Sequence, residues 1–104
     1  MQMHHMILDK DKQLIPATRD AWAAFFQSAD RHVGDSVIDG IRVSTVFLGL
    51  NHGFERAPEW FETMIFDKDG NSQGCMRCET WAQAEEQHLA FCAEVRRSRL
   101  RVVS

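Results

Sequence analysis

The chain has 104 residues, of which 44% are hydrophobic, and it contains 12 Lys and Arg, 15 Asp and Glu, and three Cys. This length and composition indicate a single globular domain over residues 1–104 and exclude a disordered chain. The longest uncharged run, residues 43–54, is too short to cross a bilayer. Because no signal peptide is visible and three Cys are too few for a disulfide scaffold, we expect a cytoplasmic protein without membrane contact.

The formal charge of −3 hides an asymmetry. All 15 acidic residues precede Val95, whereas four Arg lie in residues 96–104, so the body carries −7 and this basic C-terminal tail carries +4. The tail is either the cationic end of a helix or a short arm that contacts phosphate or an acidic partner. Four Arg without interleaved aromatics are a weak nucleic-acid signature, so nucleic acid is not an expected partner.

Two short extended segments, residues 6–8 and 14–16, open the chain, and Pro16 ends the second. Thr18 is then placed to cap a helix that ends near Arg31. The apolar residues of this helix recur with helical spacing at Ala21, Trp22, Phe25, Phe26 and Ala29. The sequence therefore predicts a short amphipathic helix before the main β region.

Four strands are expected after this helix. Asp39-Gly40 is a strong two-residue hairpin signal, and the outgoing strand over residues 41–48 is rich in β-branched and aromatic residues until Gly49 ends it. The segments that follow are a loop over residues 49–59, a strand over 60–66, a turn over 67–71 and a strand over 73–79.

A second helix follows the strands and begins at a capping box formed by Thr80 and Gln83. Its apolar stripe consists of Trp81, Ala84, His88, Phe91 and Val95. Strands joined by tight turns are antiparallel, and two amphipathic helices suffice to cover one face of such a sheet. We therefore predict an α+β fold, a two-layer sandwich in which two helices cover one face of a four-stranded antiparallel meander.

A two-residue loop at Asp69-Gly70 would place Glu62 opposite Arg77 and Met64 opposite Cys75. The third strand would then be apolar on both sides, with Trp60, Met64 and Phe66 on one and Phe61 and Ile65 on the other. Because both helices are expected on one face, the open face should pack against another copy. We expect a homodimer or a higher oligomer.

One group of residues has a spacing that zinc ligands use: Cys75, Cys78, His88 and Cys92. His88 and Cys92 lie four residues apart on one helical face. Cys75 and Cys78, however, lie in an expected strand, where their side chains point to opposite faces. A free Cys is also an ordinary small core residue, so we expect packing roles and no cofactor, with structural zinc as the alternative.

Two histidines are candidates for function. His88 is a polar group in an apolar stripe, so it is either a core residue with a hydrogen-bonding partner or a ligand-binding or acid–base group. His52 follows Asn51 between Gly49 and Gly53, which is either a ligand-contact position on a loop or a solvated turn.

Glu62 and Arg77 are either a cross-strand ion pair or, in an oligomer cleft, an anchor for carboxylate or phosphate. The chain contains no nucleophile elbow, P-loop, zinc-protease motif or dinucleotide fingerprint. His52, Glu62 and His88 could act as acid and base only if the fold brings them together.

Three strings carry a resemblance: V-S-T-V-F-L-G-L at residues 43–50, F-E-T-M-I-F at 61–66 and T-W-x-x-A-x-x-x-H at 80–88. With the helix around residues 22–26, the chain resembles a family of small proteins encoded by bacteriophages and prophages. It departs from that family at residues 54–58, where members are rich in Gly and Pro. The resemblance implies expression in the bacterial host cytoplasm and a role in phage–host interplay, and it implies no activity.

Three functions compete. The first is a non-enzymatic homo-oligomer that sequesters a small anionic, nucleotide-like ligand, as a counter-defence protein would. The residues expected to bind it are Thr45, His52, Glu62, Arg77, Trp81 and His88. The second is an interaction module that binds and inhibits a host protein, and the third is a small hydrolase that uses His52, Glu62 and His88.

Overall fold

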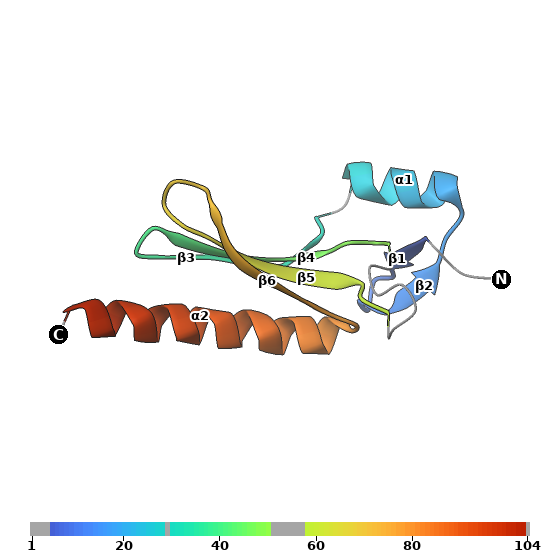
Figure 1. Cartoon of the computed structure of the whole chain (residues 1–104). Coiled ribbons are helices and arrows are strands. Elements are labelled where there is room, and N and C mark those ends of the chain that lie inside the picture. The colour runs from blue at the N-terminus through green and yellow to red at the C-terminus, as the bar shows by residue number, and fades with distance from the viewer. Residues whose placement is uncertain (1–4, 29, 51–57, 104) are drawn as a thin grey trace.

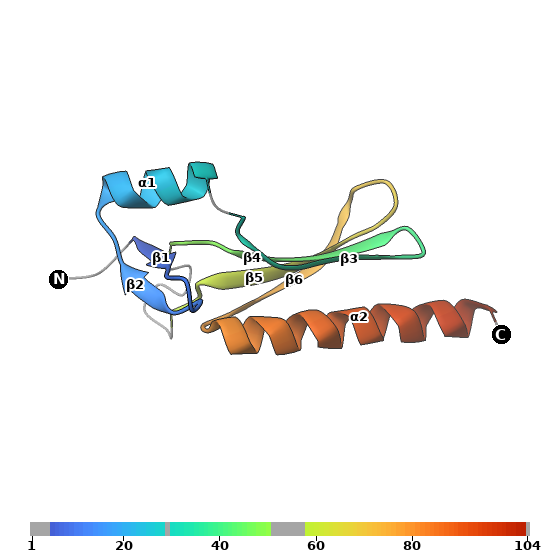
Figure 2. The ribbon, with the colours of Figure 1, turned by 180° about the vertical axis from the view of Figure 1, so that it is seen from behind.

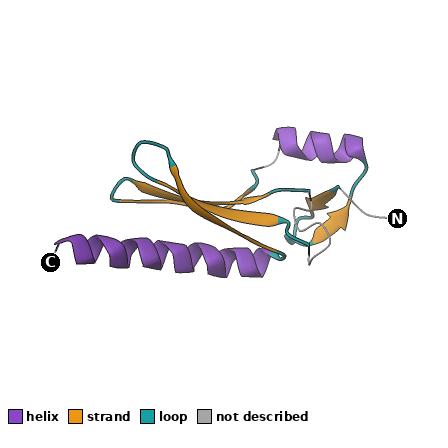
Figure 3. Ribbon diagram, viewed as in Figure 1, coloured by secondary structure: helices purple, strands orange, loops and turns teal. Residues whose placement is uncertain are grey.

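The computed structural model describes residues 5–28, 30–50 and 58–103 (Figures 1 and 3). The elements in chain order are β1 (Met6–Leu8), β2 (Leu14–Pro16), α1 (Arg19–Ser28), β3 (His32–Ile38), β4 (Ile41–Phe47), β5 (Phe61–Phe66), β6 (Ser72–Cys78) and α2 (Trp81–Val103). The last four strands form one antiparallel sheet in the order β3-β4-β5-β6, and β1 pairs with β2 separately. The predicted α+β fold and its four-stranded antiparallel meander are confirmed.

The first helix is capped as predicted. The amide of Ala21 donates to Oγ1 of Thr18 at 3.1 Å, which satisfies one of the free donors of the first turn. The helix ends at Ser28, before the expected position. Ahead of β3, the carboxylate of Asp30 accepts a hydrogen bond from the amide of His32 at 3.0 Å. This local turn directs the chain into β3.

The first hairpin of the sheet has the predicted turn. Asp39 and Gly40 both have positive φ, 50° and 83°, as a type I′ turn requires, and Ile38 pairs with Ile41 across it. The Asp-Gly pair therefore fixes the register between β3 and β4.

The second hairpin differs from the prediction at its turn and has the predicted register beyond it. The amide of Asp67 donates to the carbonyl of Asn71, so the loop spans residues 68–70 instead of the expected two residues. A register shift after Ile65 absorbs the extra residue. On the far side of this shift Glu62 lies opposite Arg77, as predicted.

The long helix forms most of the second layer. In the view of Figure 1, α2 runs below the sheet, whereas α1 lies above its other end, beside the β1–β2 hairpin; Figure 2 shows the same arrangement from behind. Phe25 and Phe26 of α1 nevertheless pack on Phe47, whose side chain lies on the sheet face that α2 covers. The helix also docks on β1 and on the segment after β4, where the indole nitrogen of Trp22 donates to the carbonyl of Gly49 at 3.1 Å. The helix is held there because Gly49 has φ 76° and no side chain in the way.

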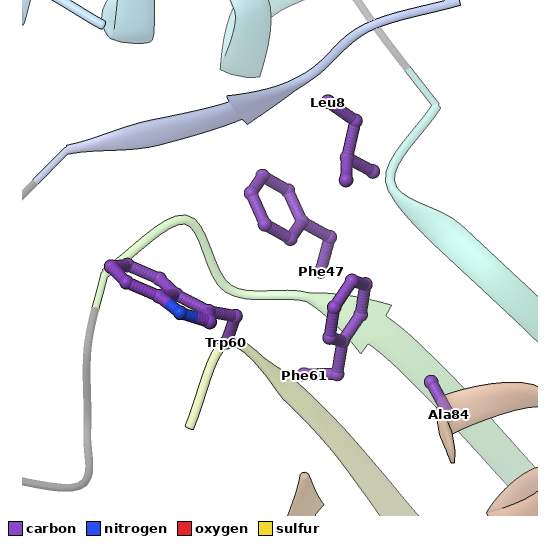
Figure 4. Packing of buried hydrophobic residues seen from close by; sticks show 5 residues of the cluster. All are labelled: Leu8, Phe47, Trp60, Phe61 and Ala84. Atoms are coloured by element: carbon purple, nitrogen blue, oxygen red, sulfur yellow. The ribbon is translucent and has the colours of Figure 1, made fainter. Parts of the chain in front are cut away.

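The hydrophobic core has two parts. One lies where the hairpin, α1, the sheet and the start of α2 meet, and it consists of Leu8, Phe47, Trp60, Phe61 and Ala84 (Figure 4). The other lies farther along α2 and contains Val43, Cys92 and Val95. The first part packs one end of the sheet against α1 and the start of α2, and the second packs the other end against the later turns of α2.

Trp60 was expected to share a face with Met64 but is buried in the first core cluster. Its amide donates to the carbonyl of Cys78 at 3.0 Å, although the register partner of Cys78 is Phe61. Two consecutive residues therefore face one residue of β6. This bulge interrupts the alternation of side chains and turns Trp60 inward.

The basic tail continues α2 through to Val103, so its positive charge lies at the C-terminal end of a helix dipole. The guanidinium of Arg97 pairs with the carboxylate of Glu94 one turn earlier. Figures 1 and 2 show that α2 extends beyond the turns of both large hairpins. None of the helices described is long and apolar enough to cross a membrane.

Candidate functional site

A chain of polar side chains runs between α2 and the sheet. Nδ1 of His88 lies 2.8 Å from Oγ1 of Thr45, and Nε2 of His88 lies 2.9 Å from the hydroxyl of Ser36. Thr45 in turn meets Oγ1 of Thr63 at 2.7 Å, and the side-chain amide of Gln87 donates to Thr63 at 2.9 Å. These five residues form the hydroxyl–histidine network.

The strands position this network. Thr45 and Thr63 are direct register partners in β4 and β5, so their hydroxyls meet on the helix-covered face. His88 reaches β3 because position 34 is a glycine: a Cβ there would stand 2.7 Å from the imidazole. The histidine therefore fills the space that any other residue at position 34 would occupy.

The donor of each hydrogen bond in the network can be assigned by starting from Gln87. The amide nitrogen of Gln87 donates both to the carbonyl of Met76 and to Oγ1 of Thr63. Because a backbone carbonyl only accepts, the atom that faces Met76 is the nitrogen, and Thr63 receives a proton from it. Thr63 has one hydroxyl proton of its own, and donating it to Thr45 lets Thr45 donate to Nδ1 of His88 and Nε2–H of His88 donate to Ser36. On this order of donors we assign the neutral Nε2–H tautomer to His88.

Burial lowers the pKa of His88 below its ordinary value, and the nearby carboxylate of Asp35 opposes the shift only in part. A second proton, on Nδ1, would also remove the acceptor of the Thr45 hydroxyl proton. Both effects favour the neutral imidazole.

The burial and the hydrogen bonds of this network indicate a structural role. Thr45 and Thr63 are 0% exposed and His88 is 7% exposed. Within the described part of the chain, each buried side-chain nitrogen and oxygen has a hydrogen-bond partner. Of the two interpretations of His88, the contacts therefore favour a core histidine whose ring nitrogens both have partners.

Glu62 and Arg77 lie on the opposite face. Strand alternation defines this open face by the side chains of Asp35, Val37, Arg42, Ser44, Val46, Glu62, Met64, Phe66, Cys75 and Arg77. Nε of Arg77 donates to the carboxylate of Glu62 at 3.0 Å, which is the cross-strand ion pair that the register predicts. The face is thus less apolar than expected.

A second ion pair crosses the open face. The guanidinium of Arg42 donates to both carboxylate oxygens of Asp35, at 2.8 and 2.9 Å, and this contact lowers the pKa of Asp35. Beside these paired charges lie Val37, which is 69% exposed, and the half-buried Val46, Met64 and Phe66.

Trp81 lies at the first turn of α2 and packs its ring on Phe61, with the centroids 6.1 Å apart. The ammonium of Lys12 lies 5.1 Å from the Trp81 ring. Trp81 thus connects the β1–β2 turn to the core. The remaining candidate, His52, lies outside the described residues.

The five candidate ligand-binding residues that the structure describes therefore do not converge on one cleft. Arg77 instead lines a hollow of about 520 Å³ at the edge of β6, with Glu59, Glu79, Gln83 and Gln87 among its other walls. Sequence reasoning did not identify Gln83 and Gln87, although their spacing of four residues places them on one side of α2. The acidic residues of this hollow outnumber Arg77.

The four candidate zinc ligands are also apart. Cys75 is exposed on the open face, Cys78 packs at the first core cluster, and Cys92 is buried in the second. Burial, together with Glu59, raises the pKa of the Cys78 thiol to about 11. Across the residues that the structure describes, no three His, Cys, Asp or Glu side chains are grouped as metal ligands.

Comparisons with protein-family models, curated proteins and solved structures each found no match. The geometry of the chain itself must therefore carry any functional proposal.

Proposed function

We propose that this chain is a non-enzymatic, homo-oligomeric protein-interaction module that binds a host protein through the open face of its sheet. The observation that carries the proposal is that only one face of the sheet is covered. α2 lies on the face with the hydroxyl–histidine network, and no described element covers the open face. This face combines the exposed Val37 and the half-buried Val46, Met64 and Phe66 with paired charges, a mixture that is typical of protein interfaces.

The separation of the candidate acid–base residues supports a binding role over catalysis. Glu62 points to the open face, whereas His88 is buried beneath α2 on the other face. A single substrate cannot contact both side chains. The resemblance to phage proteins suggests that the partner is a bacterial protein.

A hollow of about 390 Å³ on the open face supplies a specific contact point. It lies between the two hairpin turns, and its walls include Val37, Arg42, Phe66, Asp67 and Lys68. Apolar side chains beside charges of both signs suit a partner segment that combines apolar and charged residues.

The test is affinity capture from bacterial lysate with a matched pair of variants. Val37 and Leu89 are each 69% exposed, but Leu89 lies on α2, away from the open face. Val37→Glu should abolish capture of a partner that Leu89→Glu retains, and binding of that purified partner should fall at least tenfold. Equal capture by both variants would refute the open face as the binding surface.

A small anionic ligand is the second candidate, favoured by the hollow beside Arg77. Nucleotides should then raise the melting temperature of the native chain, and Arg77→Ala should remove the shift. The two negative walls, Glu59 and Glu79, make this candidate the weaker one.

A further inference from the structure

β6 is an edge strand whose outer side is open. It is the last strand in the sheet order, and no described element pairs with its outer edge. Six of its seven residues are exposed, and α2 packs mainly on β3, β4 and β5. Edge strands are usually protected by Lys, Pro, shortness or cover, and β6 has neither Lys nor Pro.

The backbone groups on this edge can be assigned. The carbonyl of Cys78 points toward β5, because it accepts from Trp60. Successive residues of an antiparallel strand alternate in direction, so the N–H and C=O of Cys75 and Arg77 point outward. The contact of Gln87 with both Met76 O and Thr63 agrees with this assignment, because it places the Met76 carbonyl on the β5 side.

We propose that β6 pairs antiparallel with β6 of a second copy, about a two-fold axis at Cys75, to form one continuous eight-stranded sheet. Cys75 is the middle residue of Ser72–Cys78, so this centre gives the longest overlap of the two strands. It sets the outward N–H and C=O of Cys75 against their own copies, so each donor of this pair faces an acceptor. It also places Arg77 opposite Gln73, the residue that the register shift leaves without a partner in β5.

The side chains on the helix side fit the same register. Met76, which is 53% exposed, would lie opposite Gly74 of the second copy, and no atom lies within 4 Å of a Cβ placed on Gly74. The exposed side chain therefore meets an empty position, and the symmetry repeats the contact. Met76 also lines a hollow of about 420 Å³ with Ala90 and Phe91, which the second copy would close.

Edge pairing is favoured over stacking of two open faces. Stacking would bury the Asp35–Arg42 and Glu62–Arg77 ion pairs, and desolvation of paired charges is costly. Edge pairing leaves both pairs in water and the open face free for a partner. The inference thus names the self-association surface of the proposed interaction module and rests on that proposal only for its oligomeric part.

Crosslinking through Cys75 tests the register. In the double variant Cys78→Ser/Cys92→Ser the only thiol is Cys75, and hydrogen-bonded strand partners have Cα atoms ~5.5 Å apart, within disulfide range. Mild oxidation or a short bismaleimide should convert most of the native protein into a covalent dimer. Adding Cys75→Ser should abolish the crosslink. A protein that is dimeric by light scattering but does not crosslink would overturn the proposal.

Cys75→Pro provides the complementary test, because it removes an outward N–H and no hydrogen bond to β5. Wild type should be a dimer at high micromolar concentration, and Cys75→Pro should be a monomer with the circular dichroism spectrum of the wild type. If this variant does not fold, Met76→Lys should give the monomer, since it places charge opposite Gly74. A monomeric wild type, or a Met76→Lys dimer, would overturn the inference.

These outcomes are separable from those of the proposed function. A Cys75-linked dimer that captures no host protein would refute host binding and leave the edge pairing intact. A monomer that captures a partner through Val37 would refute the edge pairing and leave host binding intact.

Discussion

The imidazole of His88 occupies the space into which any side chain at position 34 would grow, with Cδ2 and Nε2 both 2.7 Å from the site of a Cβ on Gly34. The ring cannot move away freely, because Ser36 and Thr45 hold its two nitrogens. The helix and β3 are thus in contact at a point that tolerates no extra atom.

Gly34→Ala should therefore destabilise the protein by about 1–3 kcal/mol, the usual cost of overpacking a core. In a His88→Ala background the same change should cost much less, because the space is then empty. Urea unfolding of the four proteins gives the coupling energy directly. Additive effects would show that the ring and position 34 do not compete for space.

Stability should depend on pH through His88. Its pKa is lowered in the folded state, so as the pH falls below about 6.5 the unfolded chain takes up the proton first. This contribution to stability is complete above that pH and is lost as the pH falls toward the folded pKa. The loss should approach a limit of about 1.4 kcal/mol per pH unit.

Urea midpoints between pH 7.5 and 5 would measure this loss, and His88→Gln should remove this part of the slope. Subtracting the two profiles cancels the other titrating groups. Nitrogen-15 NMR of the native protein should show the Nε2–H tautomer. An Nδ1–H tautomer would contradict the order of donors assigned to the network.

Gly49 should be intolerant of substitution. It has φ 76°, and a Cβ there would stand 2.2 Å from Cζ of Phe26 and 2.6 Å from Nε1 of Trp22. Left-handed backbone strain and the clash with two rings should together cost roughly 2 kcal/mol or more. In a Gly49→Ala variant, the amides of α1 should lose protection from hydrogen exchange, whereas those of α2 should stay protected. Matched loss of protection in both helices would show instead that α1 is integral to the whole fold.

Local rules predicted the local elements well. The Asp39-Gly40 turn, the Thr18 cap and the pairing of Glu62 with Arg77 each depend on residues close in sequence or on one hairpin, and all are present. The extra residue in the second turn was missed because an Asp-Gly pair fits both two-residue and three-residue loops.

Long-range placement was less accessible. The docking of α1 depends on Gly49, far from it in sequence, and on the β1–β2 pairing, which periodicity does not reveal. His88 was identified as a polar group needing a partner, but Ser36 and Gly34 come from a strand 52 or more residues away. Strand alternation does separate Glu62 from Thr45, so their division between two faces was implicit in the sequence.

The extension of α2 beyond the hairpin turns places positive charge at one end of the molecule. Four arginines follow the last acidic residue, Glu94, at one end of a body 54 Å long, while most of the acidic residues lie elsewhere along it. A single copy therefore carries a dipole along its long axis, which would orient it toward a charged surface. A two-fold axis at Cys75 reverses that direction in the second copy, so pairing cancels the component along the long axis. An isolated copy would thus turn in an electric field, whereas a pair would lose that preference.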